Sequence, residues 1–196
     1  NAIDHLKETF PTIKGTTPLL SHNPAAMLLP SAREQKGLRR KEIPTPEEEA
    51  KSALYKDEDG ALVIPSTHVR GAILNATKGQ RLAKKAASPL FAASLLWARQ
   101  YFPLLDEKGK PITKYEIDIQ RVMIGKAGVA RARPRFDPPW FVKCEFAFNP
   151  LISIEALTQA INDAGQICGI GDYRIQKKGW YGAFTLVGDV TVKTEI

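Results

Sequence analysis

Residues 153–184 read SIEALTQAINDAGQICGIGDYRIQKKGWYGAF and predict a capped helix, a glycine-rich basic loop and a strand, in that order. Ser153 is a preferred N-cap residue, and Glu155 follows in the first turn. Apolar residues then recur at helical spacing as far as Cys168, and Gly169 suits a left-handed C-cap. We therefore expect the helix to end at this glycine, with the loop leading into a last strand over 183–192.

The first part of the chain predicts a strand entry, a long loop and a short helix. Residues 7–20 contain strand formers, with Gly15 suggesting a bulge or a close backbone approach. Residues 21–46 are polar and proline-containing, which favours a loop. Thr45-Pro46 followed by three glutamates predicts a helix over 46–54.

The middle of the chain predicts a second helix and a hairpin. Asp59-Gly60 indicates a turn before a strand over 61–64, and Ser66 is expected to cap a helix from Thr67 to residue 78 or 85. We expect a strand over 93–102, although periodicity alone leaves a helix open. Residues 115–136 then predict a hairpin with its tip between two glycines, and 140–148 alternate as a half-buried strand.

This order, strand, helix, strands, strand, helix, strand, is typical of the split βαβ arrangement. We therefore expect an α+β fold: a ferredoxin-like (RRM-like) palm with inserted loops and a β-hairpin thumb. A length of 196 residues suits a single domain over 1–196, with the thumb at 115–136.

Composition narrows the class of protein. The chain is 43% hydrophobic and 25% charged, as in ordinary globular proteins. It has neither an apolar run long enough to cross a membrane nor a secretory signal in its first residues, so we expect a cytoplasmic protein. Cys144 and Cys168 lie in apolar patterns and are interpreted as core residues. No pattern points to a metal or cofactor.

A net charge of +7 favours a polyanionic partner. The charge is also segregated along the chain, as a phosphate-binding surface requires. Two basic clusters lack intervening acids: Arg121, Lys126, Arg131, Arg133 and Arg135; and Lys78, Arg81, Lys84 and Lys85. A third cluster comprises Arg33, Lys36, Arg39, Arg40 and Lys41.

The loop GIGDYRIQKKGWYG combines glycines, cations and aromatic residues. Bare backbone and cations bind phosphates, and aromatic rings such as those of Tyr173 and Trp180 stack on bases. The alternative is a helix C-cap followed by an exposed loop with aromatic anchors. The loop lacks the Lys-Ser/Thr pair of a Walker motif.

Catalytic signals are weaker. His5, His22 and His68 have no carboxylate or cysteine at ligand spacing. His22 lies in a candidate functional loop, and Asp172 is a solitary carboxylate that could act as a base or bind a metal.

Two segments resemble the RAMP superfamily of CRISPR-associated proteins. IPSTHVRGAIL resembles the motif that opens the first helix in that superfamily, with Ser66-Thr67 where Gly-Ser-Ser is usual. GIGDYRIQKKGWYGAF resembles its glycine-rich signature, in which Gly169, Gly171, Gly179, Tyr181 and Gly182 match. FPTIKGTTPLL is similar to the first strand. The short chain looks like a compact, possibly phage-encoded relative.

The resemblance implies a single-stranded RNA-binding palm that is repeated along a guide RNA in a CRISPR-type ribonucleoprotein for antiviral defence, with a thumb at 115–136. It implies partners comprising the guide RNA, further copies of the chain and other subunits. Members of the superfamily that cleave RNA use an Asp in a loop, and no Asp here aligns with that position; we therefore expect no catalytic residue, cofactor or metal, and cleavage is left open. Together with the basic clusters, the resemblance predicts these RNA-binding residues: Ser66, Thr67, His68, Arg70, Lys78, Arg121, Lys126, Arg131, Arg133, Arg135, Gly171, Tyr173, Arg174, Lys177, Lys178, Gly179 and Trp180.

Three functions therefore remain open. The first is this non-catalytic RNA-binding subunit. The second is a metal-dependent endoribonuclease that uses Asp172 or His22. The third is a phage protein that binds single-stranded nucleic acid, or a decoy that occupies a host CRISPR complex (an anti-CRISPR).

Overall fold

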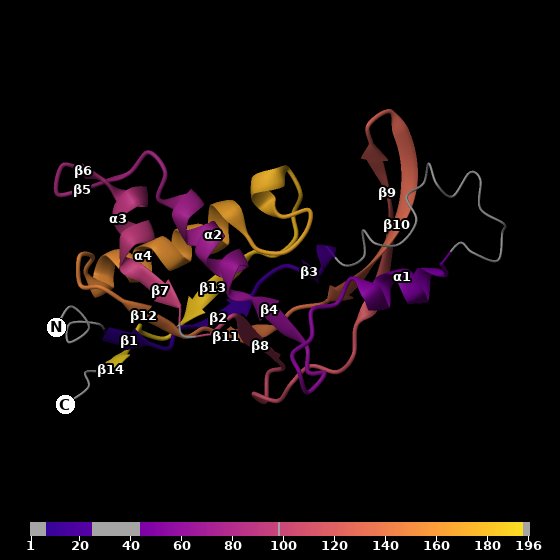
Figure 1. The fold of residues 1–196 in the computed structure, drawn as a ribbon, viewed down its shortest axis with the longest axis horizontal. Helices are drawn as coiled ribbons and strands as arrows, with labels where there is room; N and C mark the ends of the chain where they lie inside the picture. The colour runs from indigo at the N-terminus through magenta and orange to yellow at the C-terminus, as the bar shows by residue number, and fades with distance from the viewer. Residues whose placement is uncertain (1–6, 25–43, 98, 194–196) are drawn as a thin grey trace.

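The computed structural model describes residues 7–24, 44–97 and 99–193. Within them the chain forms an α+β fold with several antiparallel sheets and four α-helices (Figure 1). The helices are α1 (Pro46–Ser52), α2 (Ser66–Ala76), α3 (Ala87–Ser94) and α4 (Ile154–Asp163), and α4 continues into a π-helical turn, η4 (Ala164–Cys168). A 3₁₀ turn, η5 (Ile175–Lys177), lies in the glycine-rich loop, by which we mean residues 169–182.

Each strand pairs antiparallel with its neighbours. The five-stranded sheet has the order β13 (Phe184–Val187), β2 (Thr12–Gly15), β11 (Phe141–Lys143), β8 (Tyr101–Leu105) and β4 (Val63–Pro65). A four-stranded sheet has the order β14 (Val192–Lys193), β1 (Lys7–Thr9), β12 (Phe146–Phe148) and β7 (Leu95–Trp97). The remaining strands are β3 (Leu19–Leu20), β10 (Ala127–Phe136) and β9 (Glu116–Ile124) in one sheet, and β5 (Arg81–Leu82) with β6 (Lys85–Ala86) in another.

Helices α2 and α4 lie over one face of the five-stranded sheet (Figure 1). Side chains alternate between the two faces of a strand, so Ile13 and Val142, which pair across β2 and β11, are both buried beneath the helices. Their neighbours Lys14 and Lys143 are exposed on the other face. The core therefore fills the space between the sheet and the helices, and the face opposite carries lysines.

Several local predictions are confirmed. Thr45 caps α1 in a capping box with Glu48, and the Ser153 hydroxyl accepts the Ala156 N–H at the start of α4. The alternating apolar residues over 140–148 are buried, although a break after Lys143 divides them into β11 and β12. Gly169 takes the C-cap position after η4 with a φ of +68°, but its ψ of 174° is not that of the predicted left-handed helical cap.

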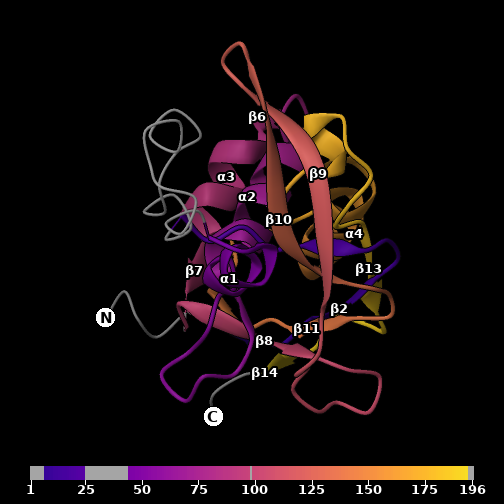
Figure 2. The same ribbon diagram turned by 90° about the vertical axis from the view of Figure 1, so that its right-hand side faces the viewer.

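The predicted hairpin over 115–136 is also present, formed by β9 and β10 (Figure 2). Ile124 pairs with Ala127, which leaves Gly125-Lys126 as a two-residue turn. Gly125 has a φ of +61°, and this suits the first central position of a hairpin turn. The hairpin projects from the body of the molecule, as a thumb would (Figures 1 and 2).

Three predictions were wrong in detail. Ser66 does not cap α2, because Pro65 takes the N-cap position and no side chain caps the helix. The predicted strand over 93–102 begins as the end of α3 and then divides into β7 and β8, because an apolar run fits either structure. The last strand is likewise divided, into β13 and β14, with Gly188 between them at a φ of +68°.

The basic cluster at 33–41 and His5 lie outside the described residues. In the ranges that the structure describes, no helix has the length and apolar character needed to span a membrane.

Candidate nucleic-acid interface

The start of α2 and the glycine-rich loop lie side by side. Together they line a pocket of about 130 Å³, with Thr67, His68 and Asn75 on the helix and Gly171 and Arg174 on the loop. Asn75 also donates a hydrogen bond to Gln176 at 3.3 Å. Two segments about a hundred residues apart in sequence, each predicted to contact RNA, therefore form one surface.

The glycines of this loop are required for close backbone packing. A Cβ at Gly179 would lie 1.7 Å from the carbonyl oxygen of Tyr173, and one at Gly171 would lie 2.4 Å from that of Leu20. The left-handed φ of +79° at Gly171 adds a second reason for glycine there. The sequence interpretation assigned these glycines to phosphate approach, whereas in the structure their open side is occupied by the chain itself.

An ion pair joins the loop to the hairpin. Arg133 on β10 is buried, and its guanidinium donates a hydrogen bond to the carboxylate of Asp172. Beside it, the Gln120 amide on β9 donates to the hydroxyl of Tyr181 at 2.7 Å. These bonds hold the base of the hairpin against the loop, so that their surfaces are continuous.

Asp172 is negatively charged at neutral pH. Burial acts to raise its pKa, but the hydrogen bond and charge of Arg133 and the N–H of Tyr173 outweigh burial and lower it. The charge of His22 makes a smaller contribution in the same direction. The carboxylate is therefore held as the counter-ion of Arg133.

Two further hairpin arginines are also paired with acids. Arg131 donates to Glu49 on α1 at 2.9 Å, and Arg135 donates to Asp137 at 3.3 Å. Glu49 accepts the Ala132 N–H as well, so α1 covers the free edge of β10. The basic cluster of the hairpin is therefore largely neutralised by acids from other parts of the chain.

The other two cations of the hairpin remain exposed. Lys126 lies in the turn at the tip. Arg121 lies over Gly128, where an added Cβ would be 2.2 Å from the Arg121 Nε. On the same face of β9 as Arg121, Ile119 and Met123 are both more than half exposed.

The residues predicted at the start of α2 differ in accessibility. Ser66 is buried, Thr67 is exposed, and Arg70 donates to the carbonyl oxygen of Ala92 on α3 at 2.8 Å. His68 packs edge-on against Tyr55, with ring centroids 5.4 Å apart. Burial, and to a lesser degree the charge of Arg174, lowers the pKa of His68, so its imidazole is neutral at pH 7.

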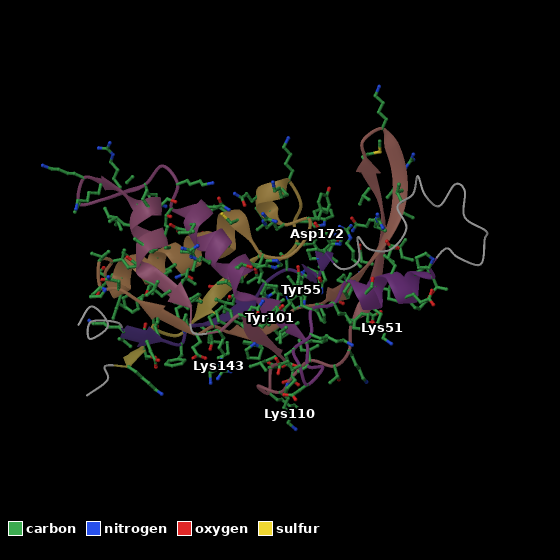
Figure 3. The ribbon with its side chains drawn as sticks, viewed as in Figure 1. Lys51, Tyr55, Tyr101, Lys110, Lys143 and Asp172 are labelled. Carbon is green, nitrogen blue, oxygen red and sulfur yellow. The ribbon has the colours of Figure 1, made fainter. Side chains whose placement is uncertain are left out.

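The outer part of the loop is the most accessible. Trp180 is 73% exposed, and Tyr173, at an unusual φ of +46°, is 44% exposed with its ring centroid 6.0 Å from that of Tyr181. Lys177 and Lys178 are exposed between these aromatic residues, and Lys78 is exposed after the end of α2. Figure 3 shows Asp172 on the side that faces the hairpin, with Lys110 and Lys143 across the molecule on the sheet side.

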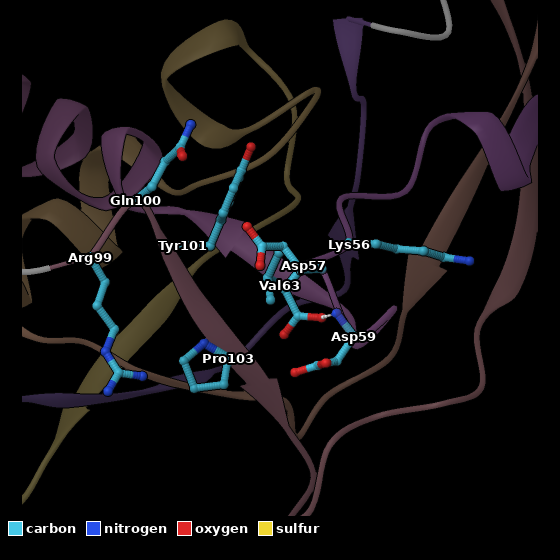
Figure 4. Close-up of a pocket in the computed structure, with 9 residues that line it drawn as sticks. Lys56, Asp57, Asp59, Val63, Arg99, Gln100, Tyr101 and Pro103 are labelled. Atoms are coloured by element: carbon cyan, nitrogen blue, oxygen red, sulfur yellow. Dashed lines mark hydrogen bonds between the residues drawn. The ribbon is translucent and has the colours of Figure 1, made fainter.

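A larger pocket, of about 680 Å³, lies away from this surface, beside β4 and β8 (Figure 4). Two of its charged side chains have partners in the chain. Asp57 accepts the N–H groups of Asp59 and Ala61 to shape a turn, and Arg99 pairs with Glu145 at 2.8 Å. No pattern in the sequence predicted this pocket.

Among the described residues, no group of three or more His, Cys, Asp or Glu side chains is arranged to hold a metal ion. Comparison of the chain with protein-family models and with curated proteins found no match.

The contacts of Gln120, Tyr181 and Glu49 were not anticipated from sequence. Gln120 and Tyr181 are 61 residues apart, and Glu49 is 83 residues from Ala132, so no local pattern predicts these contacts. The alternation of β9 was the available signal, because it places Gln120 on the same face as Asp118.

Proposed function

We propose that this protein binds single-stranded RNA, without cleaving it, on the loop face. We define the loop face as the start of α2, the glycine-rich loop and the hairpin β9–β10. The observation that carries the proposal is the pocket shared by α2 and the loop, together with the Arg133–Asp172 bond that adds the hairpin. These contacts make one surface from the segments that carry exposed cations and aromatic rings.

The distribution of free charge assigns different roles to the basic residues. Lys177, Lys178, Arg121 and Lys126 are exposed and contact phosphates, whereas Arg131 and Arg133 position the hairpin through their acids. The ring of Trp180 stacks on a base, a contact that tolerates any base because each has a π-face. Binding is therefore steeply salt-dependent and only weakly sequence-specific.

The strand order supports a ferredoxin-like palm. The run β13–β2–β11–β8 is antiparallel throughout, with α2 following β2 in the chain and α4 following β11. This is the order of a split βαβ unit, to which β4 adds an edge strand. Together with the two RAMP-like motifs on one surface, this strand order supports the proposal that the protein is a subunit that oligomerises along a guide RNA in a CRISPR-type ribonucleoprotein.

Fluorescence anisotropy with a labelled RNA of about 20 nucleotides tests the proposal. For wild-type protein, the logarithm of the association constant should fall linearly with the logarithm of the salt concentration, with a slope of about −0.7 per phosphate neutralised. Lys177→Gln/Lys178→Gln should make that slope shallower by about 1.4. DNA of the same sequence, used as a competitor, separates an RNA-binding subunit from a protein that prefers single-stranded DNA.

Lys110→Gln/Lys143→Gln is the matched control. It also removes two positive charges, but from the sheet side of the molecule (Figure 3). Equal weakening by both double variants would mean that net charge alone attracts the RNA, and no binding by wild-type protein at low salt would overturn the proposal.

The endoribonuclease is the second candidate, because the charge of His22 acts on Asp172 and so the two suggested residues lie near each other. The pairing of Asp172 with Arg133 and with the Tyr173 N–H favours a positioning role instead. Incubating the protein with RNA in magnesium and in EDTA decides between them. We expect intact RNA in both, and cleavage that is lost in Asp172→Asn would establish the nuclease.

A further inference from the structure

A small second hairpin, β5–β6, carries a strained turn with a lysine in it. Arg81 pairs with Ala86 and Leu82 with Lys85, which leaves Ala83-Lys84 as the two turn residues. Both have left-handed backbones, with φ values of +46° and +69°. Two-residue turns of this kind strongly favour Asn-Gly, because side chains at positive φ are strained. Strained backbone residues often lie at functional sites, so the side chains that this turn exposes are candidates for binding.

The turn presents unpaired positive charge. Four cations, Lys78, Arg81, Lys84 and Lys85, are exposed within eight residues that include no acid. Within the described chain, none of them has a carboxylate partner within ion-pair distance. The acid nearest in the hydrogen-bond network, Asp163, instead accepts the side-chain amides of Gln80 and Gln159. This cluster differs from the arginines of β9–β10, which acids neutralise.

Helix α2 connects this hairpin to the loop face. The first turn of α2 lines the pocket beside Arg174, and Lys78 follows its last turn. Eleven residues at 1.5 Å each separate the two ends by about 16 Å. Both β5–β6 and the glycine-rich loop lie on the helical side of the molecule (Figures 1 and 2).

The field at Cys168 gives an independent link. Burial raises the pKa of this thiol, and the charges of Arg174 and of Lys78 both act to lower it. Cys168 therefore lies within reach of the charge of a loop cation, Arg174, and of Lys78 at the base of β5–β6, which places the two cations on neighbouring parts of the molecule.

We propose that β5–β6 is a second phosphate-binding contact for the same RNA strand, which runs from the glycine-rich loop along α2 to Lys84 and Lys85. The inference rests on the proposed function and extends the site beyond it. Residues 78–86 contain no aromatic residue that could stack on a base, so this contact engages the RNA backbone alone and is independent of sequence.

The test is RNA binding by Arg81→Gln/Lys84→Gln/Lys85→Gln, measured by anisotropy between about 0.05 and 0.5 M salt. Loss of three phosphate contacts should make the slope shallower by about 2. If the variant and wild-type protein have equal affinities at 1 M salt, this slope makes the variant bind on the order of 50-fold more weakly than wild-type protein at 0.15 M. The control is Lys14→Gln/Lys110→Gln/Lys143→Gln, which removes the same charge from the sheet side. Equal affinities and slopes for the two triple variants would overturn the proposal.

Lys84→Gly separates binding from folding. Glycine relieves the strain at a φ of +69°, so the variant should have a higher Tm and yet bind RNA about fourfold more weakly at 0.15 M salt. Unchanged or tighter binding would assign the turn a purely structural role and refute the inference.

The two proposals fail in different ways. If Lys177→Gln/Lys178→Gln weakens binding and the β5–β6 variant does not, the second contact is refuted and the loop face stands. If wild-type protein binds no RNA at low salt, both proposals are refuted.

Discussion

The bond between Arg133 and Asp172 allows the sharpest prediction about stability. Asp172→Asn keeps the shape of the side chain and removes its charge. The side chain of Arg133 is 6% exposed, so its guanidinium would be left buried without a counter-charge. Among the described residues, its remaining side-chain partner is Gln120, at 3.5 Å, which is at the limit of hydrogen-bond distance.

The size of the effect follows from the burial of the two partners. Removing one partner of a buried ion pair costs about 3–5 kcal/mol, because the other charge stays desolvated. The side chain of Asp172 is 37% exposed, so water and salt reduce this cost, and we expect about 2–3 kcal/mol. For a domain of this size, the Tm should fall by about 4–12 °C.

Urea unfolding at about pH 7 measures the change directly. Asp189→Asn is the control, since it neutralises an exposed aspartate and should alter the free energy of unfolding by less than about 0.5 kcal/mol. Arg133→Met/Asp172→Asn should cost less than the sum of the two single variants, because no buried charge is then left alone. If Asp172→Asn were as stable as the control, the structural role of the bond would be refuted.

The same bond predicts a dependence on pH. The pKa of Asp172 is lower in the folded protein than the ordinary value of about 3.9. The stability it contributes is therefore fully present above that ordinary value and is lost as pH falls through the lower folded value. The difference between wild-type protein and Asp172→Asn should be constant from about pH 5 to 7 and shrink below about pH 4. A difference that grew in acid would contradict the ion pair.

Three further predictions test the packing. Gly182→Ala should destabilise the fold by more than about 1 kcal/mol in urea unfolding, because φ is +71° and the new Cβ would lie 1.8 Å from the carbonyl oxygen of Ile170; an unaffected midpoint would refute the close approach. Cys144 is fully buried with a strongly raised pKa, so an alkylating reagent should modify it only in urea, and rapid labelling of native protein would contradict its burial. Thr45→Ala should cost about 1 kcal/mol by removing the hydroxyl that accepts the Glu48 N–H, and thermal melting that matched wild-type protein would show that the cap is not formed.

Local signals in the sequence were sufficient for much of the fold. The caps at Thr45 and Ser153 each depend on a hydroxyl three residues from the N–H it accepts, so a short window contains both partners. The buried face over 140–148 and the turn at Gly125 were also predicted correctly, because each depends on residues within a short window of sequence. Ser66 failed as a cap because Pro65 before it already fits that position, with a φ of −57°.

The candidate site was predicted less completely, because charge pairing depends on the tertiary fold. The sequence of β10 shows three arginines and no acid, yet Glu49 and Asp172 reach two of them from 82 and 39 residues away. Lys178 and Lys84 belong to the cations that have no acid partner among the described residues. The sequence shows them as basic residues but does not distinguish them, as candidates for phosphate binding, from the arginines that acids neutralise. Ranking them required the position of every acid in the fold.

The most direct test of RNA binding at the loop face is the fluorescence of Trp180. Of the three tryptophans, Trp180 is 73% exposed and Trp140 is fully buried, so RNA stacked on the loop should quench the part of the emission that Trp180→Phe removes. Titration with a uridine oligonucleotide should quench wild-type emission to saturation, and Trp180→Phe should abolish that quenching while it retains most of the affinity seen by anisotropy. Binding that left the emission of Trp180 unchanged would contradict the account.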